Sequence, residues 1–139
     1  MKKIVLFGST NYMEQMLEMR DVLTRMGHLV RLPAFDRFPN MSAYDVCDYN
    51  RSLVDWCDVA FFWWDQRSPG AIFDFGMVFM SRKPIKIIYL EKKVFKDVFL
   101  EHEEKSMKEV ANDIDFEEVM KLYSKALESR KGLFVDKKV

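Results

Sequence analysis

Four short runs, rich in β-branched and aromatic residues, constrain the fold of this chain more than any other feature. They cover Ile4–Phe7, His28–Leu32, Val59–Trp64 and Ile85–Leu90. The run Ile4–Phe7 is continuous and rich in β-forming residues, as expected for a strand that is buried on both faces, and Val59–Trp64 is apolar at every position. These runs therefore predict the strands of a mainly parallel sheet.

The segments between these runs carry apolar residues at helical spacing. Residues 12–26 show the clearest stripe, and Gly27 supplies its stop signal. The other predicted helices are Tyr44–Trp56, Gly70–Met80 and Phe116–Ser129, whereas residues 33–43 predict a loop and 91–106 are ambiguous. Strands that alternate with helices form βαβ units. We therefore expect a single α/β domain over residues 1–139: three layers, with a mainly parallel sheet of about four to five strands flanked by helices (flavodoxin/Rossmann-like), and a helical C-terminal part over 91–139.

Composition excludes several classes of function. Lys plus Arg (22) balances Asp plus Glu (22), so no bulk positive field attracts nucleic acid. No apolar run approaches the roughly 20 residues that span a bilayer, and the N-terminus lacks the pattern of a secretion signal, so we expect a cytoplasmic protein without a membrane partner. Cys47 and Cys57 are too few for a disulfide framework or a zinc site and predict reduced thiols. We expect neither a metal nor a cofactor, and a solvated tail that contains the basic residues Arg130, Lys131, Lys137 and Lys138.

In parallel α/β sheets, ligands bind at the carboxyl ends of the strands. Three segments of this chain lie there: Gly8–Asn11, Pro33–Pro39 and Asp65–Gly70. The site should therefore be built from these segments.

The opening stretch KKIVLFGST, residues 2–10, resembles a phosphate-binding loop, but it lacks the residues that such loops require. A dinucleotide fingerprint needs three glycines, and here only Gly8 is present. A P-loop lysine is absent, and the histidine pair of a cytidylyltransferase-type enzyme is missing because His28 follows the first helix. The turn either caps a helix through Ser9 or Thr10, or forms one wall of a different pocket.

Residues 50–90 hold the most informative sequence, NRSLVDWCDVAFFWWDQRSPGAIFDFGMVFMSRKPIKIIYL. Asp58 opens an apolar strand, a short polar loop leads to Ser68-x-Gly70 and Asp74-x-Gly76, and Lys83-Pro84 precedes the next strand. Together with Gly8-Ser9, this order resembles the nucleoside 2-deoxyribosyltransferase family and its relatives, the 2'-deoxynucleoside 5'-monophosphate N-glycosidases. The resemblance covers about residues 3–90.

The resemblance implies a carboxylate nucleophile at Asp74, where the family carries a glutamate that attacks the anomeric carbon of the sugar. Aspartate is one methylene shorter. A position in the first helical turn should keep Asp74 ionised through the helix dipole. Asn50 occupies the place of a family aspartate and cannot act as a general base, although it can hydrogen-bond a hydroxyl. The competing interpretation is that Asp74 only satisfies free amides at the start of the helix.

The same resemblance implies a set of substrate-binding residues. Ser68 and Gly70 would meet the sugar or a 5'-phosphate at a helix N-terminus. Gly8 and Ser9 would line the other side of the sugar, and Asp65 would bind a base edge or a sugar hydroxyl. Further candidates are aromatic residues that could stack on the base, and two arginines that could neutralise a phosphate: Phe35, Phe38, Trp63, Trp64, Arg37 and Arg67. Core packing and solvated loop charge are the respective alternatives.

Three hypotheses follow. The chain is an enzyme that cleaves or transfers at the N-glycosidic bond of a nucleoside or nucleotide, or a nucleotide- or nucleotide-sugar-binding module that has lost catalysis because of Asn50 and Asp74. The third possibility is a small interaction protein without a ligand. Helices 12–26 and 70–80 are rich in Met and Phe and supply more apolar surface than a small domain buries, which together with the resemblance predicts a homodimer or a higher homo-oligomer.

Overall fold

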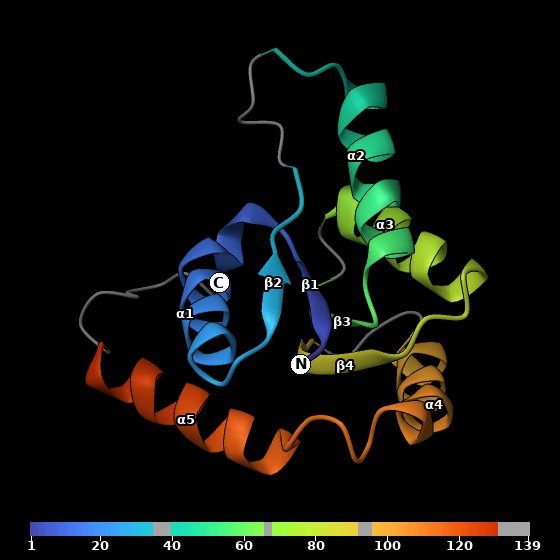
Figure 1. The fold of residues 1–139 in the computed structure, drawn as a ribbon. Helices are drawn as coiled ribbons and strands as arrows, with labels where there is room; N and C mark the ends of the chain where they lie inside the picture. Colours follow the sequence, from blue (N-terminus) through green and yellow to red (C-terminus); the bar gives the residue numbers. More distant parts are fainter. Residues whose placement is uncertain (35–39, 66–67, 92–95, 131–139) are drawn as a thin grey trace.

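The computed structural model describes residues 1–34, 40–65, 68–91 and 96–130. Its sheet consists of β1 (Lys3–Phe7), β2 (Leu29–Arg31), β3 (Val59–Trp64) and β4 (Ile85–Leu90), in the order β2-β1-β3-β4. Every neighbouring pair is parallel (Figure 1). The predicted parallel sheet is confirmed.

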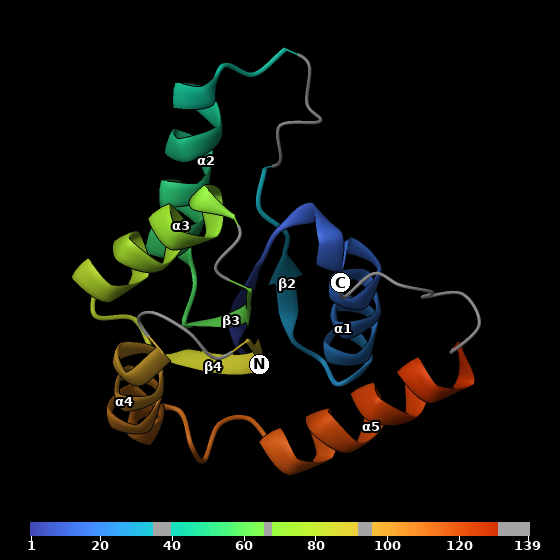
Figure 2. The same ribbon diagram turned by 180° about the vertical axis from the view of Figure 1, so that it is seen from behind.

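The helices form a layer on each face of this sheet. They are α1 (Met13–Arg25), α2 (Ala43–Trp56), α3 (Pro69–Met80), α4 (Lys96–Ser106) and α5 (Phe116–Ser129), with short 3-10 turns η1 (Thr10–Tyr12) and η2 (Met107–Glu109). Figures 1 and 2 show α1 and α5 on one side of the sheet, and α2, α3 and α4 on the other. The three-layer α/β prediction is therefore confirmed, and the ambiguous segment before residue 106 contains a helix.

Strand side chains alternate between two apolar cores. Leu6 and Trp63 pack in the core shared with α1 and α5, whereas Phe7 and Trp64 pack in the core shared with α2, α3 and α4. Both tryptophans are fully buried because helices cover both faces of β3. Trp63 donates a hydrogen bond to the hydroxyl of Tyr123 at 3.1 Å.

Polar side chains of α4 satisfy the backbone of β4, a strand at the edge of the sheet. The amide of Ile85 donates to Ser106 Oγ at 3.1 Å, and the amide of Ile87 donates to Glu103 at 2.6 Å. Unpaired edge amides are a liability in any sheet. Glu103 and Ser106 thus have a structural role in this segment that hydrophobic periodicity does not reveal.

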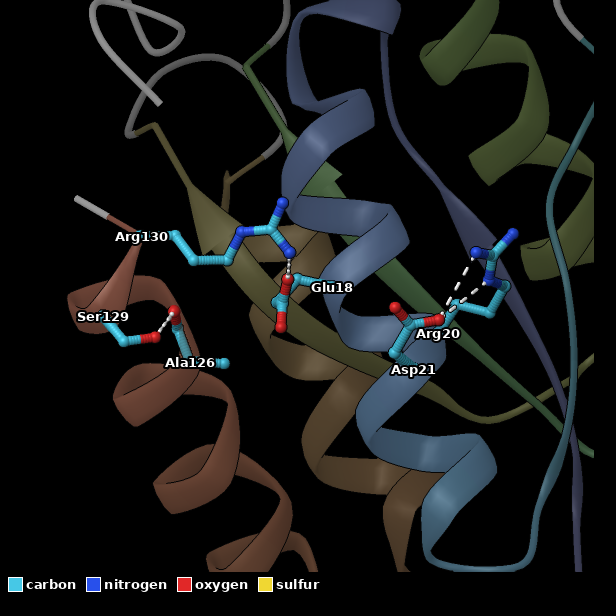
Figure 3. Close-up of polar contacts among 6 residues, drawn as sticks. All are labelled: Glu18, Arg20, Asp21, Ala126, Ser129 and Arg130. Atoms are coloured by element: carbon cyan, nitrogen blue, oxygen red, sulfur yellow. Dashed lines mark hydrogen bonds and ion pairs between the residues drawn. The ribbon is translucent and has the colours of Figure 1, made fainter. Parts of the chain in front are cut away.

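An ion pair joins α5 to α1. Arg130 donates to Glu18 at 2.6 Å, and Glu18 is buried on α1 (Figure 3). Arg130 is therefore not part of a solvated tail, contrary to the prediction. The other basic residues of that predicted tail lie outside the described residues.

Two motif residues from the sequence have structural roles. The Asp58 carboxylate accepts a hydrogen bond from the amide of Lys3 at 2.9 Å and so ties β3 to the start of β1. Lys83 Nζ donates to the carbonyls of Asp55 (3.2 Å) and Cys57 (2.7 Å) at the end of α2. A cation at a helix C-terminus is stabilising because the last carbonyls lack intrahelical partners.

Candidate functional site

A cavity of about 310 Å³ opens at the carboxyl end of the sheet. It is lined by Gly8–Thr10 after β1, by Pro33 and Ala34 after β2, by one face of α2, and by the first two turns of α3. The chain passes from β1 outward to β2 and then returns to place β3 on the other side of β1. Such a reversal of strand order creates a crevice at the strand ends. The cavity lies where the sequence predicted the site.

Asp74 is the one carboxylate among the described residues that line this cavity. Asp74 is 7% exposed. Burial raises the pKa of its carboxyl from 3.8 to about 7, and a hydrogen bond from Asn50 partly offsets this rise. The expectation of a first-turn position was wrong: α3 begins at Pro69, so Asp74 is its sixth residue and lies beyond the reach of the free amides. Desolvation, rather than the helix dipole, controls the charge of this group.

Asn50 links Asp74 to the segment after β2. Its Oδ1 accepts a hydrogen bond from the amide of Ala34 at 2.8 Å, and its Nδ2 lies 3.4 Å from both the Ala34 carbonyl and Asp74 Oδ1. An aspartate here could accept from the Ala34 amide, but an ionised one could not donate to the other two oxygens. The amide at position 50 is thus matched to its partners, and it presents a donor to Asp74.

The turn after β1 combines a close packing contact with a cap. Ser9 Oγ accepts from the amide of Asn11 at 3.3 Å, so Ser9 is the N-cap of the 3-10 turn, one of the two caps predicted. A Cβ added to Gly8 would lie 3.0 Å from Trp63 Cβ and 3.3 Å from the Trp63 carbonyl oxygen. A side chain at position 8 would press against the neighbouring strand, so this packing favours glycine there whatever the cavity holds.

The N-terminus of α3 forms the opposite wall. Ser68 is the N-cap, and its Oγ accepts from the amide of Ala71 at 3.2 Å. Pro69 has no N–H group, and the amide of Ile72 donates to the Ser68 carbonyl at 3.2 Å. Among the described residues, the amide of Gly70 has no acceptor, and Gly70 borders the cavity.

Asp65 lies apart from the other predicted site residues. It is 1% exposed at the end of β3 and is not among the residues that line the cavity. Its carboxylate forms a hydrogen bond with Tyr12, and burial together with the charge of Asp65 raises the pKa of that phenol far above its usual range. The structure thus brings together Gly8, Ser9, Asn50, Ser68, Gly70 and Asp74 but not Asp65.

The predicted aromatic and basic contacts divide into two groups. Trp63 and Trp64 belong to the cores and do not line the cavity, so the suggestion that one of them stacks on a base was wrong. The remaining candidates, Phe35, Phe38, Arg37 and Arg67, lie outside the described residues.

Sequence reasoning missed several lining residues, among them Val46, Cys47 and Phe73. Val46 and Cys47 precede Asn50 by four and three positions, so helical spacing alone places them on the same face. Cys47 is a half-buried free thiol, and Cys57 is buried and free, as predicted.

Comparison with known proteins supports the fold. No protein-family model matches the chain, and no curated protein matches it in sequence. The structure is similar to that of a CMP N-glycosidase, BcmB of Clostridium botulinum. The TM-score is 0.58 at 18% sequence identity, over 76% of this chain and 83% of the other. At this identity the likeness establishes a shared architecture.

Two further properties bear on the chemistry. Within residues 1–34, 40–65, 68–91 and 96–130, no group of three or more His, Cys, Asp and Glu side chains is arranged to hold a metal ion. In the same part of the chain, no helix combines the length and apolar character needed to cross a membrane.

Proposed function

We propose that this protein cleaves the N-glycosidic bond of a nucleoside 5'-monophosphate, with Asp74 as the catalytic carboxylate. One observation carries the proposal: a buried carboxylate on the wall of a cavity whose described lining contains no other acidic side chain. Burying a carboxylate is costly, and a strongly perturbed pKa in a cleft indicates a functional site. The architecture shared with a CMP N-glycosidase supports the same reaction class.

In the proposed reaction, ionised Asp74 attacks C1' of the sugar. The C1'–N bond breaks, its electron pair leaves with the base, and the base nitrogen takes a proton from water. A water molecule then attacks C1' and releases the carboxylate, and the proton that this water loses passes through solvent to the hydroxide left by the first step. The transition states are oxocarbenium-like, so a negative charge next to C1' lowers their energy. Transfer to a second base, in place of water, would use the same first step.

The walls of the cavity suit a phosphorylated sugar. The N-terminus of α3 borders the cavity through Ser68–Gly70, and Ser9 and Thr10 border it after β1. Helix N-termini favour anions, and the amide of Gly70 and the hydroxyls of Ser9 and Thr10 are donors there. We assign the 5'-phosphate to this end of the cavity and the anomeric carbon to the end near Asp74.

Asn50 acts in this proposal as a positioning residue. Its amide donates toward Asp74 Oδ1 and thereby favours the ionised, attacking form of the carboxylate. Its two contacts with Ala34 fix the direction of that donor. This arrangement replaces the acid–base role that the resemblance assigns to an aspartate at the same place.

A binding module without catalysis is the second candidate, and the short side chain of Asp74 favours it. A displacement of about 1 Å from the attack geometry costs roughly 100-fold in rate. An Asp74→Glu variant separates the two candidates. A catalytic Asp74 loses activity when the side chain is lengthened, whereas a module that has lost catalysis binds nucleotide as wild type and gains base release through the longer side chain.

The test is release of free base from ribo- and deoxyribonucleoside 5'-monophosphates, followed by chromatography. The proposal predicts turnover for the wild type and a loss of about 100-fold or more for Asp74→Ala. Asp55→Ala, an exposed change on α2, is the matched control and should retain full activity. Absence of turnover across the panel at high enzyme concentration would overturn the proposal.

A further inference from the structure

Tyr12 and Asp65 form a buried polar pair that lies outside the cavity lining and takes no part in the proposed reaction. Tyr12 is 2% exposed and Asp65 is 1% exposed. The two side chains share a hydrogen bond, in which the phenol O–H donates and the carboxylate accepts. Burial of polar groups is costly, and two apolar side chains of similar volume would fill this space without that cost. The pair therefore calls for a role beyond packing.

Each member of the pair lies close in sequence to a wall of the cavity. Tyr12 ends η1, and its amide donates to the Ser9 carbonyl at 3.0 Å, which holds it to the turn that supplies Ser9 and Thr10 to the lining. Asp65 directly follows β3 and precedes Ser68, the N-cap of α3, by three positions. The bond between the two side chains thus links the wall after β1 to the wall at the start of α3.

Backbone hydrogen bonds of the sheet stop short of these two walls. The pairing of β1 with β3 ends at Phe7 and Phe62. Beyond these residues β3 pairs with β4, while the chain after β1 turns into η1. The bond between Tyr12 and Asp65 continues the connection past that point. The ring of Tyr12 also packs on that of Tyr89 in β4, with ring centroids 5.5 Å apart, and this contact orients the hydroxyl.

We propose that Tyr12 and Asp65 are positioning residues whose bond, which we name the Tyr12–Asp65 tie, sets the spacing between two groups of phosphate donors. The groups are the hydroxyls of Ser9 and Thr10 on one wall and the amide of Gly70 on the other. This role rests on the proposed function, which assigns the 5'-phosphate to the space between them. Hydrogen bonds to a charged oxygen are short, about 2.5–2.9 Å, so a small change in spacing weakens one group of donors. The tie thereby gives the site its preference for a phosphorylated substrate over the free nucleoside.

A purely structural role for the pair makes a different prediction, which Tyr123 tests. Tyr123 is a buried phenol in the same apolar core, and its hydroxyl accepts a hydrogen bond from Trp63 at 3.1 Å. It belongs to α5, which contributes no residue to the described lining of the cavity. Tyr123→Phe therefore removes a buried hydroxyl and its bond, as Tyr12→Phe does, but leaves both walls connected. If the tie only stabilises the core, the two variants should bind ligands alike.

Calorimetric titration of the full chain with nucleoside 5'-monophosphates and the matching nucleosides tests the proposal. All proteins carry Asp74→Asn, so that the ligand is not consumed. The parent should bind a monophosphate about 10-fold or more tightly than its nucleoside. Tyr12→Phe should lose about 10-fold in affinity for the monophosphate and keep its affinity for the nucleoside, whereas Tyr123→Phe should keep both. Circular dichroism checks that each variant is folded at the assay temperature.

Substitutions at Asp65 give a second readout that keeps the phenol in place. Asp65→Asn retains an oxygen that can accept from Tyr12 and should keep most of the phosphate preference, whereas Asp65→Leu should lose it. Tyr12→Phe combined with Asp65→Leu should lose no more of the preference than the larger single loss, because both changes remove the same bond. Two additive losses would overturn the proposal, as would a preference that Tyr12→Phe leaves unchanged.

Binding and turnover together separate the tie from the proposed function. If Tyr12→Phe retains the phosphate preference while the wild type releases base, the tie is wrong and the function stands. If the wild type releases no base but Tyr12→Phe loses the preference, the function is wrong and the tie stands. A parent protein that binds the monophosphate and the nucleoside equally, or binds neither, would overturn the tie.

Discussion

Replacing Asp74 with Asn removes a buried ionisable group and should stabilise the fold in a pH-dependent way. The pKa of Asp74 is raised from 3.8 to about 7 in the folded protein. Between these values the unfolded chain releases a proton that the folded chain retains, so rising pH favours unfolding. Above about pH 7, Asp74 is ionised in both the folded and the unfolded state. Its burial then lowers the free energy of unfolding by a constant amount, about 4 kcal/mol for a pKa shift of this size.

Asn has nearly the same shape as Asp and can still accept the hydrogen bond from Asn50, but it does not titrate. The variant should therefore be more stable than wild type, by an amount that grows by about 2–3 kcal/mol between pH 5 and pH 8. For a chain of this length, that growth corresponds to a relative shift in melting temperature of roughly 5–12 °C.

The assay is thermal or urea unfolding of both proteins across this pH range, with Asp55→Asn as an exposed control on α2. The control should follow the wild-type curve at every pH. If the difference in stability between Asp74→Asn and wild type is the same from pH 5 to pH 8, then Asp74 has an ordinary pKa and the electrostatic reasoning is wrong.

Four further outcomes follow from the site. Gly8→Ala should lower the free energy of unfolding by about 1–3 kcal/mol, because the added Cβ would press on Trp63. Gly70→Ala should keep the wild-type stability, because its Cβ would lie at an ordinary contact distance of 3.7 Å from Ser68 Oγ. Unfolding of the two variants under the same conditions compares them directly. Asn50→Asp should lower the melting temperature more at pH 8 than at pH 5, because two ionised carboxylates then face each other without a donor between them. Base release by wild type should rise with pH through an apparent pKa near 7, and a flat profile would contradict Asp74 as the ionised nucleophile. Lys83→Met should cost about 1–2 kcal/mol in urea unfolding, since the carbonyls at the end of α2 lose their cation, and an unchanged midpoint would show that water replaces it fully.

Most strand and helix positions could be predicted from the sequence, because burial against a parallel sheet requires apolar residues at a characteristic spacing. β3 and β4 coincide with the predicted runs, and α5 coincides with the amphipathic stripe Phe116–Ser129. The bounds of α4 did not follow from the pattern, which left residues 91–106 ambiguous within the expected helical C-terminal part, because polar side chains of α4 bond to the edge of β4, a contact that hydrophobic periodicity cannot express.

The burial and the raised pKa of Asp74 could not be predicted from the spacing of apolar residues. The predicted helix Gly70–Met80 already makes Asp74 the fifth residue, beyond the first turn, and the helix-start signal Ser68-Pro69 makes it the sixth, so the first-turn expectation was a miscount and not a gap in the sequence signal. The burial that raises its pKa arises from the packing of α3 beside α2, which no local pattern specifies. The sequence predicted the burial of at least one tryptophan of β3, and helices on both faces of the sheet bury the two.

The most direct test of the account is a crystal structure of Asp74→Asn with a bound nucleoside 5'-monophosphate. We predict that C1' lies within about 3.5 Å of the side chain at position 74, the spacing of a near-attack geometry. We also predict that the phosphate accepts a hydrogen bond from the amide of Gly70. A nucleotide bound elsewhere on the protein, or one whose base or phosphate occupies the place next to residue 74, would contradict the account.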